Sequence, residues 1–227
     1  MALLFLLAFV YLPFFLCSFL CPRHPHVLNV YFGVPGSGKT TFAAHLTKWA
    51  LHENILIRFC RNHENRVTRL LLNSRYLKRR IDVYSNVPIT GAYRLNAKED
   101  IGFYMIENAK IIIDEAGIEY NNRSYKTFPQ ESIYFYKYHR HYRVSVDVFS
   151  QSYEDMDVTL RRLAQNFYVV RRSLVPFCVV ARRIVRKVGV DEHTRQIADL
   201  YAMGLPILDT RRIFSPPLWK LFNSYSR

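Results

Sequence analysis

Two short segments of the sequence carry residue types that could bind and cleave a nucleoside triphosphate. The first runs from Gly33 to Thr40 and reads Gly-Val-Pro-Gly-Ser-Gly-Lys-Thr. Its glycines let consecutive backbone N–H groups surround a phosphate chain at the start of a helix. We expect Lys39 to bridge the β- and γ-phosphates of ATP and Thr40 to hold Mg²⁺ through its hydroxyl. The residues expected to contact the nucleotide are Gly33, Val34, Pro35, Gly36, Ser37, Gly38, Lys39, Thr40 and Thr41.

The second segment is an acidic pair, Asp114-Glu115, that ends the apolar run Ile111-Ile-Ile113. A wholly apolar, β-branched run is typical of a strand buried on both faces of a parallel sheet. A carboxylate at the end of such a strand can orient Mg²⁺, which makes Asp114 the second expected metal ligand beside Thr40. Glu115 is then the expected general base for the attacking water.

Ser150-Gln151 ends another apolar run, and Gln151 could contact the γ-phosphate or the attacking water if that strand lies between the first two. A polar cap of an ordinary strand end is the alternative. Arg161 and Arg162 follow on the next predicted helix, where one could serve as an arginine finger for a neighbouring subunit. Solvation of the surface or contact with acidic partners explains them nearly as well. Lys39, Glu115, Gln151, Arg161 and Arg162 are thus the expected catalytic residues.

Alternating strand and helix patterns surround these residues. Strands are expected at 27–32, 55–59, 81–85, 110–113 and 144–149. Helices are expected at 39–52, 64–80, 129–142 and 157–165. Two further β-type runs, 167–172 and 178–185, predict a hairpin, and residues 191–227 predict an irregular tail. This order is typical of an α/β domain.

The composition favours one catalytic module in a reducing compartment. The 227 residues are 50% hydrophobic, and Lys and Arg outnumber Asp and Glu by 32 to 18, a formal charge of +14. Such an excess attracts nucleic acid or anionic lipid, or it solvates the surface. The four cysteines suggest no disulfide framework. Cys60 and His63 lack a second pair that would complete a zinc site.

Residues 1–21 contain no charged side chain, and as a helix they would extend about 31 Å, enough to cross a bilayer. The positive charge at Arg23 follows the apolar run, which favours an anchor with its C-terminal side in the cytoplasm over a cleavable signal peptide. The sequence therefore predicts a transmembrane anchor at 1–22 and a single-pass membrane protein.

The segment from Tyr136 to Arg143 interleaves aromatic and basic residues, including His139 and His141. It could stack the bases of single-stranded DNA while neutralising phosphates. It could equally pack its tyrosines into the core. Two histidines two residues apart on a helix point in different directions, which disfavours a metal pair.

The motifs together resemble the zonula occludens toxin-like (Zot) family, the assembly ATPases of filamentous phages. The resemblance covers about residues 27–172 and rests on five segments in addition to the glycine-rich loop. They are Tyr84-Ser-Asn-Val-Pro88, Ile112-Ile-Asp-Glu-Ala116, His139-Arg-His141, Val146-Asp-Val-Phe-Ser-Gln151 and Leu160-Arg-Arg162. It implies an inner-membrane ATPase of the FtsK/HerA branch that extrudes virions as a homo-oligomer with coat and other assembly proteins.

The expected fold class is α/β: a P-loop NTPase with a RecA-like or FtsK/HerA-type additional-strand parallel sheet flanked by helices, preceded by an N-terminal transmembrane helix. The expected domains are an anchor at 1–22, an ATPase domain at 23–190 and the tail at 191–227. Expected partners are copies of the chain, a membrane, phage assembly proteins and single-stranded DNA. A DNA-translocating motor, a small-molecule kinase and a non-hydrolysing nucleotide-gated scaffold remain alternatives.

Overall fold

The computed structural model describes residues 26–53, 80–120, 129–190, 197–206 and 208–222, without the side chains of 118, 119 and 186–200. The chain divides into two compact units, Met1–His24 with Leu51–Arg80 and Pro25–Ala50 with Ile81–Arg227. Nearly all of the described residues belong to the second unit. The expected strand at 55–59 and the expected helix at 64–80 lie outside the described residues, apart from Arg80.

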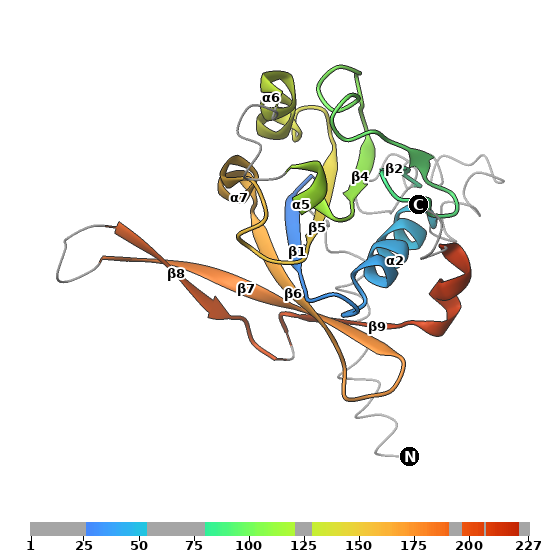
Figure 1. Cartoon of the computed structure of the whole chain (residues 1–227), viewed down its shortest axis with the longest axis vertical. Coiled ribbons are helices and arrows are strands. Elements are labelled where there is room, and N and C mark those ends of the chain that lie inside the picture. Colours follow the sequence, from blue (N-terminus) through green and yellow to red (C-terminus); the bar gives the residue numbers. More distant parts are fainter. Residues whose placement is uncertain (1–25, 54–79, 121–128, 191–196, 207, 223–227) are drawn as a thin grey trace, which may run out of the picture. The chain divides into compact units, whose positions relative to one another are not determined.

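The second unit is built on one sheet (Figure 1). Its parallel strands follow the order β3-β2-β4-β5-β1-β6, and β7 and β8 continue it in antiparallel orientation, with β9 also paired to β7. The strands are β1 (Leu28–Phe32), β2 (Asp82–Ser85), β3 (Tyr93–Arg94), β4 (Ala109–Ile113), β5 (Ser145–Ser150), β6 (Asn166–Arg172), β7 (Cys178–Val190), β8 (Ile197–Met203) and β9 (Thr210–Phe214).

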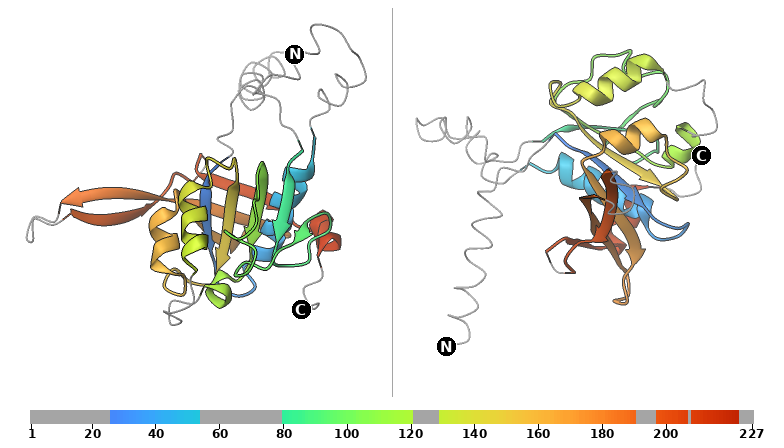
Figure 2. Two further views of the ribbon diagram at one scale, coloured as in Figure 1. Left: turned by 90° about the horizontal axis from the view of Figure 1, so that it is seen from above. Right: turned by 90° about the vertical axis from the view of Figure 1, so that its left-hand side faces the viewer.

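Helices cover both faces of this sheet (Figure 2). They are α2 (Lys39–Leu51), α5 (Ala116–Glu119), α6 (Gln130–Tyr138), α7 (Val158–Leu163) and the 3₁₀ helix η1 (Pro216–Leu221). α6 and α7 lie on one face, and α2 lies on the other. The central strands β1, β4 and β5 are buried at every position because both of their faces are covered.

Alternation along the strands sends side chains to two different interiors. Leu28 and Val30 of β1 join the apolar core under α6 and α7. Tyr31, on the opposite face, stacks between Phe149 and Tyr168, with ring centroids 4.7 and 4.9 Å away, and contacts Phe42 of α2. This aromatic layer joins α2 to the centre of the sheet. The glycine-rich loop leads directly into the first turn of α2.

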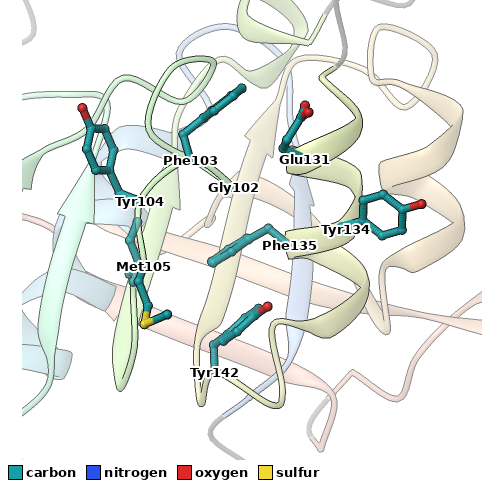
Figure 3. A pocket seen from close by; sticks show the side chains of 9 residues that line it. Gly102, Phe103, Tyr104, Met105, Glu131, Tyr134, Phe135 and Tyr142 are labelled. Atoms are coloured by element: carbon teal, nitrogen blue, oxygen red, sulfur yellow. The ribbon is translucent and has the colours of Figure 1, made fainter.

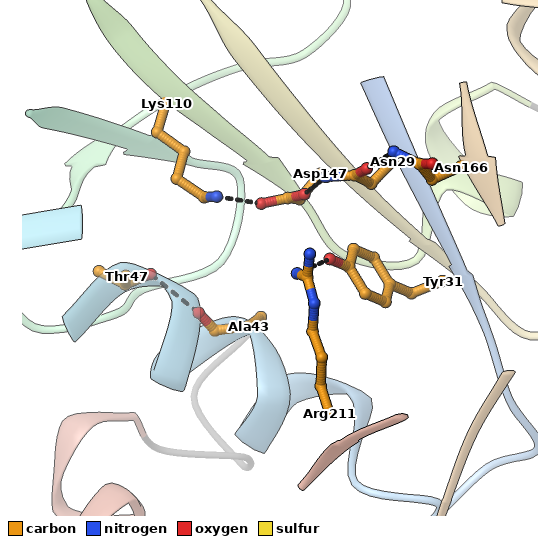
Figure 4. Close-up of polar contacts among 8 residues, drawn as sticks. All are labelled: Asn29, Tyr31, Ala43, Thr47, Lys110, Asp147, Asn166 and Arg211. Atoms are coloured by element: carbon orange, nitrogen blue, oxygen red, sulfur yellow. Dashed lines mark hydrogen bonds and ion pairs between the residues drawn. The ribbon is translucent and has the colours of Figure 1, made fainter. Parts of the chain in front are cut away.

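A row of polar side chains crosses the α2 face of the sheet beside this aromatic layer (Figure 4). The fully buried Asp147 of β5 forms an ion pair with Lys110 of β4 and accepts from the Asn29 amide of β1 at 2.7 Å. Asn166 of β6 donates in turn to Asn29 at 2.9 Å. Four adjacent strands are thus joined by side chains as well as by their backbones.

The fold expected from the sequence needs two corrections. In the part of the chain that the structure describes, no helix is long and apolar enough to cross a membrane. The longest described helix, α2, has 13 residues, whereas a bilayer core requires about 20. The expected anchor at 1–22 lies outside the described residues. The N-terminal transmembrane helix and the single-pass inner-membrane location are therefore not supported by the structure.

The second correction concerns the sheet, which is mixed and not parallel throughout, because β7, β8 and β9 run antiparallel to their neighbours. The hairpin expected from residues 167–172 and 178–185 is present as β6 and β7. Residues 191–227, expected to be irregular, contain β8, β9 and η1 among their described positions. The described residues of β8 and β9 therefore belong to the sheet.

Candidate nucleotide site

The glycine-rich loop lies at the carboxyl edge of the sheet, between β1 and α2. The Gly33 N–H donates to the Ser150 carbonyl at 3.2 Å, which ties the start of the loop to the end of β5. A Cβ at Gly33 would lie 2.6 Å from the Val170 carbonyl oxygen, so only glycine fits there. Gly38 has a φ of 95°, and a Cβ on it would lie 2.6 Å from a methyl carbon of Val179.

Lys39 is the first residue of α2, and its side chain folds back over the loop. Its ammonium donates to the carbonyls of Gly33 at 2.6 Å and Val34 at 3.2 Å. Burial lowers the pKa of Lys39, while the nearby carboxylates of Asp114 and Glu115 act in the opposite direction. The positive charge is thus held at the loop and close to the acidic pair.

Thr40 and Asp114 meet directly, although 74 positions separate them in the chain. The Thr40 hydroxyl donates to Asp114 Oδ2 at 2.7 Å. Hydroxyl and carboxylate oxygens are ligands that Mg²⁺ prefers, so this pair fits the expected ion. Burial raises the pKa of Asp114 above its ordinary value of 3.8, partly offset by the hydrogen bond from Thr40. Perturbed carboxyl groups of this kind cluster at functional sites.

The raised pKa of Asp114 gives a prediction about stability. Its ionised form is disfavoured in the folded chain, so above about pH 4 the charge costs folding free energy that an amide would not cost. Asp114→Asn should therefore raise the urea midpoint of the ligand-free full chain at pH 7. The advantage should shrink as the pH falls through the folded pKa toward 3.8, where Asp114 becomes protonated. A lower midpoint for the variant at pH 7 would contradict this account.

Asn86, just beyond β2, fixes the backbone of Asp114. Its amide nitrogen donates to the Asp114 carbonyl at 2.8 Å, and its amide oxygen accepts from the Asp114 N–H at 2.8 Å. The side chain thereby extends the pairing of β2 with β4 by one residue. Sequence reasoning gave Asn86 no role of its own. Its only signal was its position directly after a strand, within the segment Tyr84–Pro88.

Glu115 adopts an uncommon backbone conformation, with φ 53° and ψ 46°, directly before α5. Its N–H donates to Asp114 Oδ1 at 3.0 Å. Left-handed conformations of residues other than glycine carry strain and occur often at functional sites. The turn keeps Glu115 beside Asp114 at the edge of the sheet that also carries the loop.

β5 lies between β1 and β4, which is the arrangement that a contribution from Gln151 requires. Gln151 is exposed at the carboxyl end of β5, next to the buried Ser150. Ser150 Oγ and Ser37 Oγ are buried and have no hydrogen-bond partner among the described residues. Ser37 of the loop, Asp114 after β4 and Ser150 at the end of β5 therefore lie at one edge of the sheet. The hydroxyl groups of Ser37 and Ser150 could each still form a hydrogen bond.

Arg161 and Arg162 are not brought to the glycine-rich loop of their own chain. They lie in the last turn of α7, and shortly after them Gln165 N–H donates to the carbonyl of Leu28, at the opposite end of β1. The Arg161 guanidinium lies 4.7 Å from the ring centroid of Tyr153. Tyr153 packs in turn against Phe32, the residue before Gly33, with ring centroids 5.4 Å apart.

Arg172, which sequence reasoning did not single out, is the arginine at the loop. It ends β6, and its Nε donates to the Gly36 carbonyl at 2.8 Å. It is one of several paired arginines in the sequence, so nothing in the pattern distinguished it. Only the parallel pairing of β6 with β1 places it beside the loop.

The aromatic and basic segment 136–143 divides between core and surface. Tyr136 is fully buried and His139 is 2% exposed, with its Nδ1 2.7 Å from the Tyr136 carbonyl oxygen, so packing explains these two residues. Burial lowers the pKa of His139. Tyr138 is half exposed and contacts the ring of His141. The described residues contain no group of three or more His, Cys, Asp or Glu side chains that could hold a metal ion, and Cys60 and His63 lie outside them.

A separate surface pocket of about 350 Å³ lies beside α6 (Figure 3). Phe103 and Met105 line one side, and Tyr134, Phe135 and Tyr142 line the other. It contains none of the residues expected to act on a nucleotide. The candidate site is therefore the edge formed by the loop, the acidic pair and the end of β5.

Among solved structures, the chain is similar to the N-terminal domain of zonular occludens toxin from Neisseria meningitidis. The two share 15% identity over 87% of this chain and 99% of that domain, with a TM-score of 0.48. That domain is from the family that the motifs resemble. At this identity the similarity concerns the fold and not the activity.

Two further solved structures are similar, with lower sequence identity and lower TM-scores. The genome packaging NTPase of Sulfolobus turreted icosahedral virus 2 has 11% identity over 78% of this chain and 98% of its own, with a TM-score of 0.40. The flagellar accessory protein FlaH from Methanocaldococcus jannaschii has 12% identity over 84% and 95%, with a TM-score of 0.42. No protein-family model and no curated protein matches the chain.

Proposed function

We propose that this chain binds ATP with Mg²⁺ and hydrolyses it to drive the assembly and extrusion of filamentous phage particles. The observation that carries the nucleotide site is the hydrogen bond from Thr40 to Asp114, which joins the glycine-rich loop to the acidic strand end. The phage role is supported by the sequence motifs that resemble the Zot family. The strand order, with β5 between β1 and β4, supports hydrolysis because it offers Gln151 as a third polar group.

The residues divide the chemistry among them. Thr40 and Asp114 would hold Mg²⁺, which when bound supplies positive charge against the β- and γ-phosphate oxygens. Lys39 would exchange its loop carbonyls for phosphate oxygens. Glu115 would take a proton from water as the water oxygen bonds to the γ-phosphorus, and the bond from that phosphorus to the β–γ bridging oxygen breaks, releasing ADP and phosphate.

The position of α7 supports an oligomer as the active form. The contacts described for Arg161 and Arg162 do not include the loop of their own chain, and an arginine finger is often supplied by a neighbouring subunit. We therefore propose a homo-oligomer in which α7 of one subunit approaches the nucleotide of the next. Coat and other assembly proteins, and single-stranded DNA, complete the proposed partners.

The direct test is phosphate release by the purified full chain supplied with Mg·ATP and no acceptor. Turnover that Lys39→Ala abolishes would support an ATPase and separate it from a small-molecule kinase, which needs an acceptor. The phage role is tested by the yield of released particles from cells carrying the Lys39→Ala chain, which should fall to background. ATP binding with negligible turnover, even in assembled oligomers, would favour the nucleotide-gated scaffold instead.

Arg172 provides a more specific prediction for nucleotide affinity. Its guanidinium is held at Gly36, where phosphate charge would arrive, but it is exposed and therefore partly screened. Arg172→Ala should weaken Mg·ATP binding by about 5-fold in equilibrium titrations. Arg171→Ala is the matched control because neighbouring strand residues point to opposite faces. An equal loss in both variants would indicate a general charge effect and not a contact at the loop.

A further inference from the structure

We propose that Phe177 and Trp219 form a stacking platform for the base of the nucleotide whose phosphates occupy the glycine-rich loop. The inference rests on the proposed nucleotide site and extends it to a part of the ligand that the loop cannot hold. Phe177 precedes β7, and Trp219 lies in η1; their ring centroids are 6.0 Å apart at an interplanar angle of 66°.

The platform adjoins the loop through β7. Val179, two residues after Phe177, lies against Gly38, so close that a Cβ on that glycine would be 2.6 Å from its methyl carbon. Phe177 lies in the turn before β7, and because consecutive Cα atoms are about 3.8 Å apart its Cα lies within about 7.6 Å of the Val179 Cα. η1 is tied to the same place, because the N–H of Ser215 donates to the Phe177 carbonyl at 2.8 Å. The segments that carry the two rings therefore adjoin the contact between Val179 and the loop.

The two rings are exposed on the surface and are not part of the hydrophobic core. Phe177 is 61% exposed and Trp219 is 52% exposed. Leu218 of η1 and Ser215, directly before η1, are by contrast buried and anchor this helix. Phe177 also has a φ of 60°, an uncommon conformation for a bulky residue. A strained backbone that presents an aromatic ring to solvent beside a phosphate loop fits a contact made with a ligand.

The chemistry of this surface suits a base ring and not a further phosphate. The exposed side chains at the tip of the β6–β7 hairpin are apolar, as Leu174 and Val175 are with Phe177. Arg172, the last residue of β6, donates its Nε–H to the Gly36 carbonyl. Stacking on an aromatic ring is available to every base through its π-face, so this platform would contribute affinity with little reading of base edges.

The test compares ATP with inorganic tripolyphosphate, each with Mg²⁺, on the full chain. Base stacking should make ATP bind about 5- to 150-fold more tightly than tripolyphosphate. Trp219→Ala and Phe177→Ala should each remove at least about 5-fold of the ATP affinity and change tripolyphosphate affinity less than about twofold. Trp219→Phe should retain most of the ATP affinity. Phe103→Ala, an exposed aromatic on the α6 side of the sheet, should change neither.

Fluorescence supplies an independent readout, because the chain has two tryptophans. In a Trp49→Phe background, ATP should change the emission of Trp219 and tripolyphosphate should not. Equal affinities that Trp219→Ala leaves unchanged would overturn the platform alone. A changed oligomer mass without a changed ATP affinity would assign the surface to a second copy of the chain. Failure to bind either ligand would overturn the proposed function together with this inference.

Discussion

Replacing Glu115 by Gln is expected to lower ATP turnover by about 10²–10⁴-fold while leaving Mg·ATP affinity almost unchanged. The amide keeps the size of the side chain but cannot accept the proton of the attacking water, and general base catalysis typically contributes a factor of that size. The backbone of residue 115 donates to Asp114 through its N–H, which the substitution retains, so the metal-binding pair should stay in place.

Phosphate release under saturating ATP measures the first effect, and equilibrium titration measures the second. Glu131→Gln is a suitable control because it also replaces a glutamate by its amide, in the first turn of α6 away from the loop. The general-base assignment would be refuted by turnover in Glu115→Gln within about threefold of the unsubstituted chain. A parallel loss of affinity would indicate a role in binding.

Asp147→Ala is expected to reduce the free energy of unfolding by about 3–5 kcal/mol. The substitution leaves the Lys110 ammonium buried without its counter-charge and removes the acceptor of the Asn29 amide. An uncompensated buried charge costs far more than the net value of the pair, because the ammonium loses water without gaining a partner. Urea unfolding of the full chain at pH 7 measures the loss.

Two further variants separate the ion pair from a simple loss of packing. Replacing both partners, as Lys110→Met with Asp147→Leu, should restore much of the stability, since apolar residues of similar volume often replace a buried pair without cost. Asp82→Ala removes an exposed acid from β2 and should change stability by no more than about 0.5 kcal/mol. A double variant as unstable as Asp147→Ala would argue against the uncompensated charge as the cause.

The central strands and the loop were accessible from sequence because their signals are local. β1, β4 and β5 are largely apolar runs, followed in turn by the glycine-rich loop, by Asp114 and by Gln151, and the glycine spacing of the loop is set by the phosphate chain it surrounds. The role expected for Gln151 depended on the order of the strands, and the sequence did not predict that order. Sequence alone did not say that β5 would lie between β1 and β4.

The missed features depend on contacts between distant parts of the chain. β3 has only two residues, too few for any periodic pattern. β9 is defined by its pairing with β7 and has a mostly exposed sequence, so nothing local marked it as a strand. Arg172 was one arginine among many, and Asp147 was one acid in an apolar run. Their roles follow from the strands beside them.

The contact between Asn86 and Asp114 also limits how the sequence can vary. The amide of Asn86 both donates to and accepts from the backbone of one residue. An aspartate at position 86 would place a carboxylate against the carbonyl of Asp114 and beside its acidic side chain, and a serine offers a single oxygen in place of two separate groups. Position 86 should therefore be as restricted among natural variants as the acidic pair, although the contacts described for it are with the backbone of Asp114 and not with a phosphate.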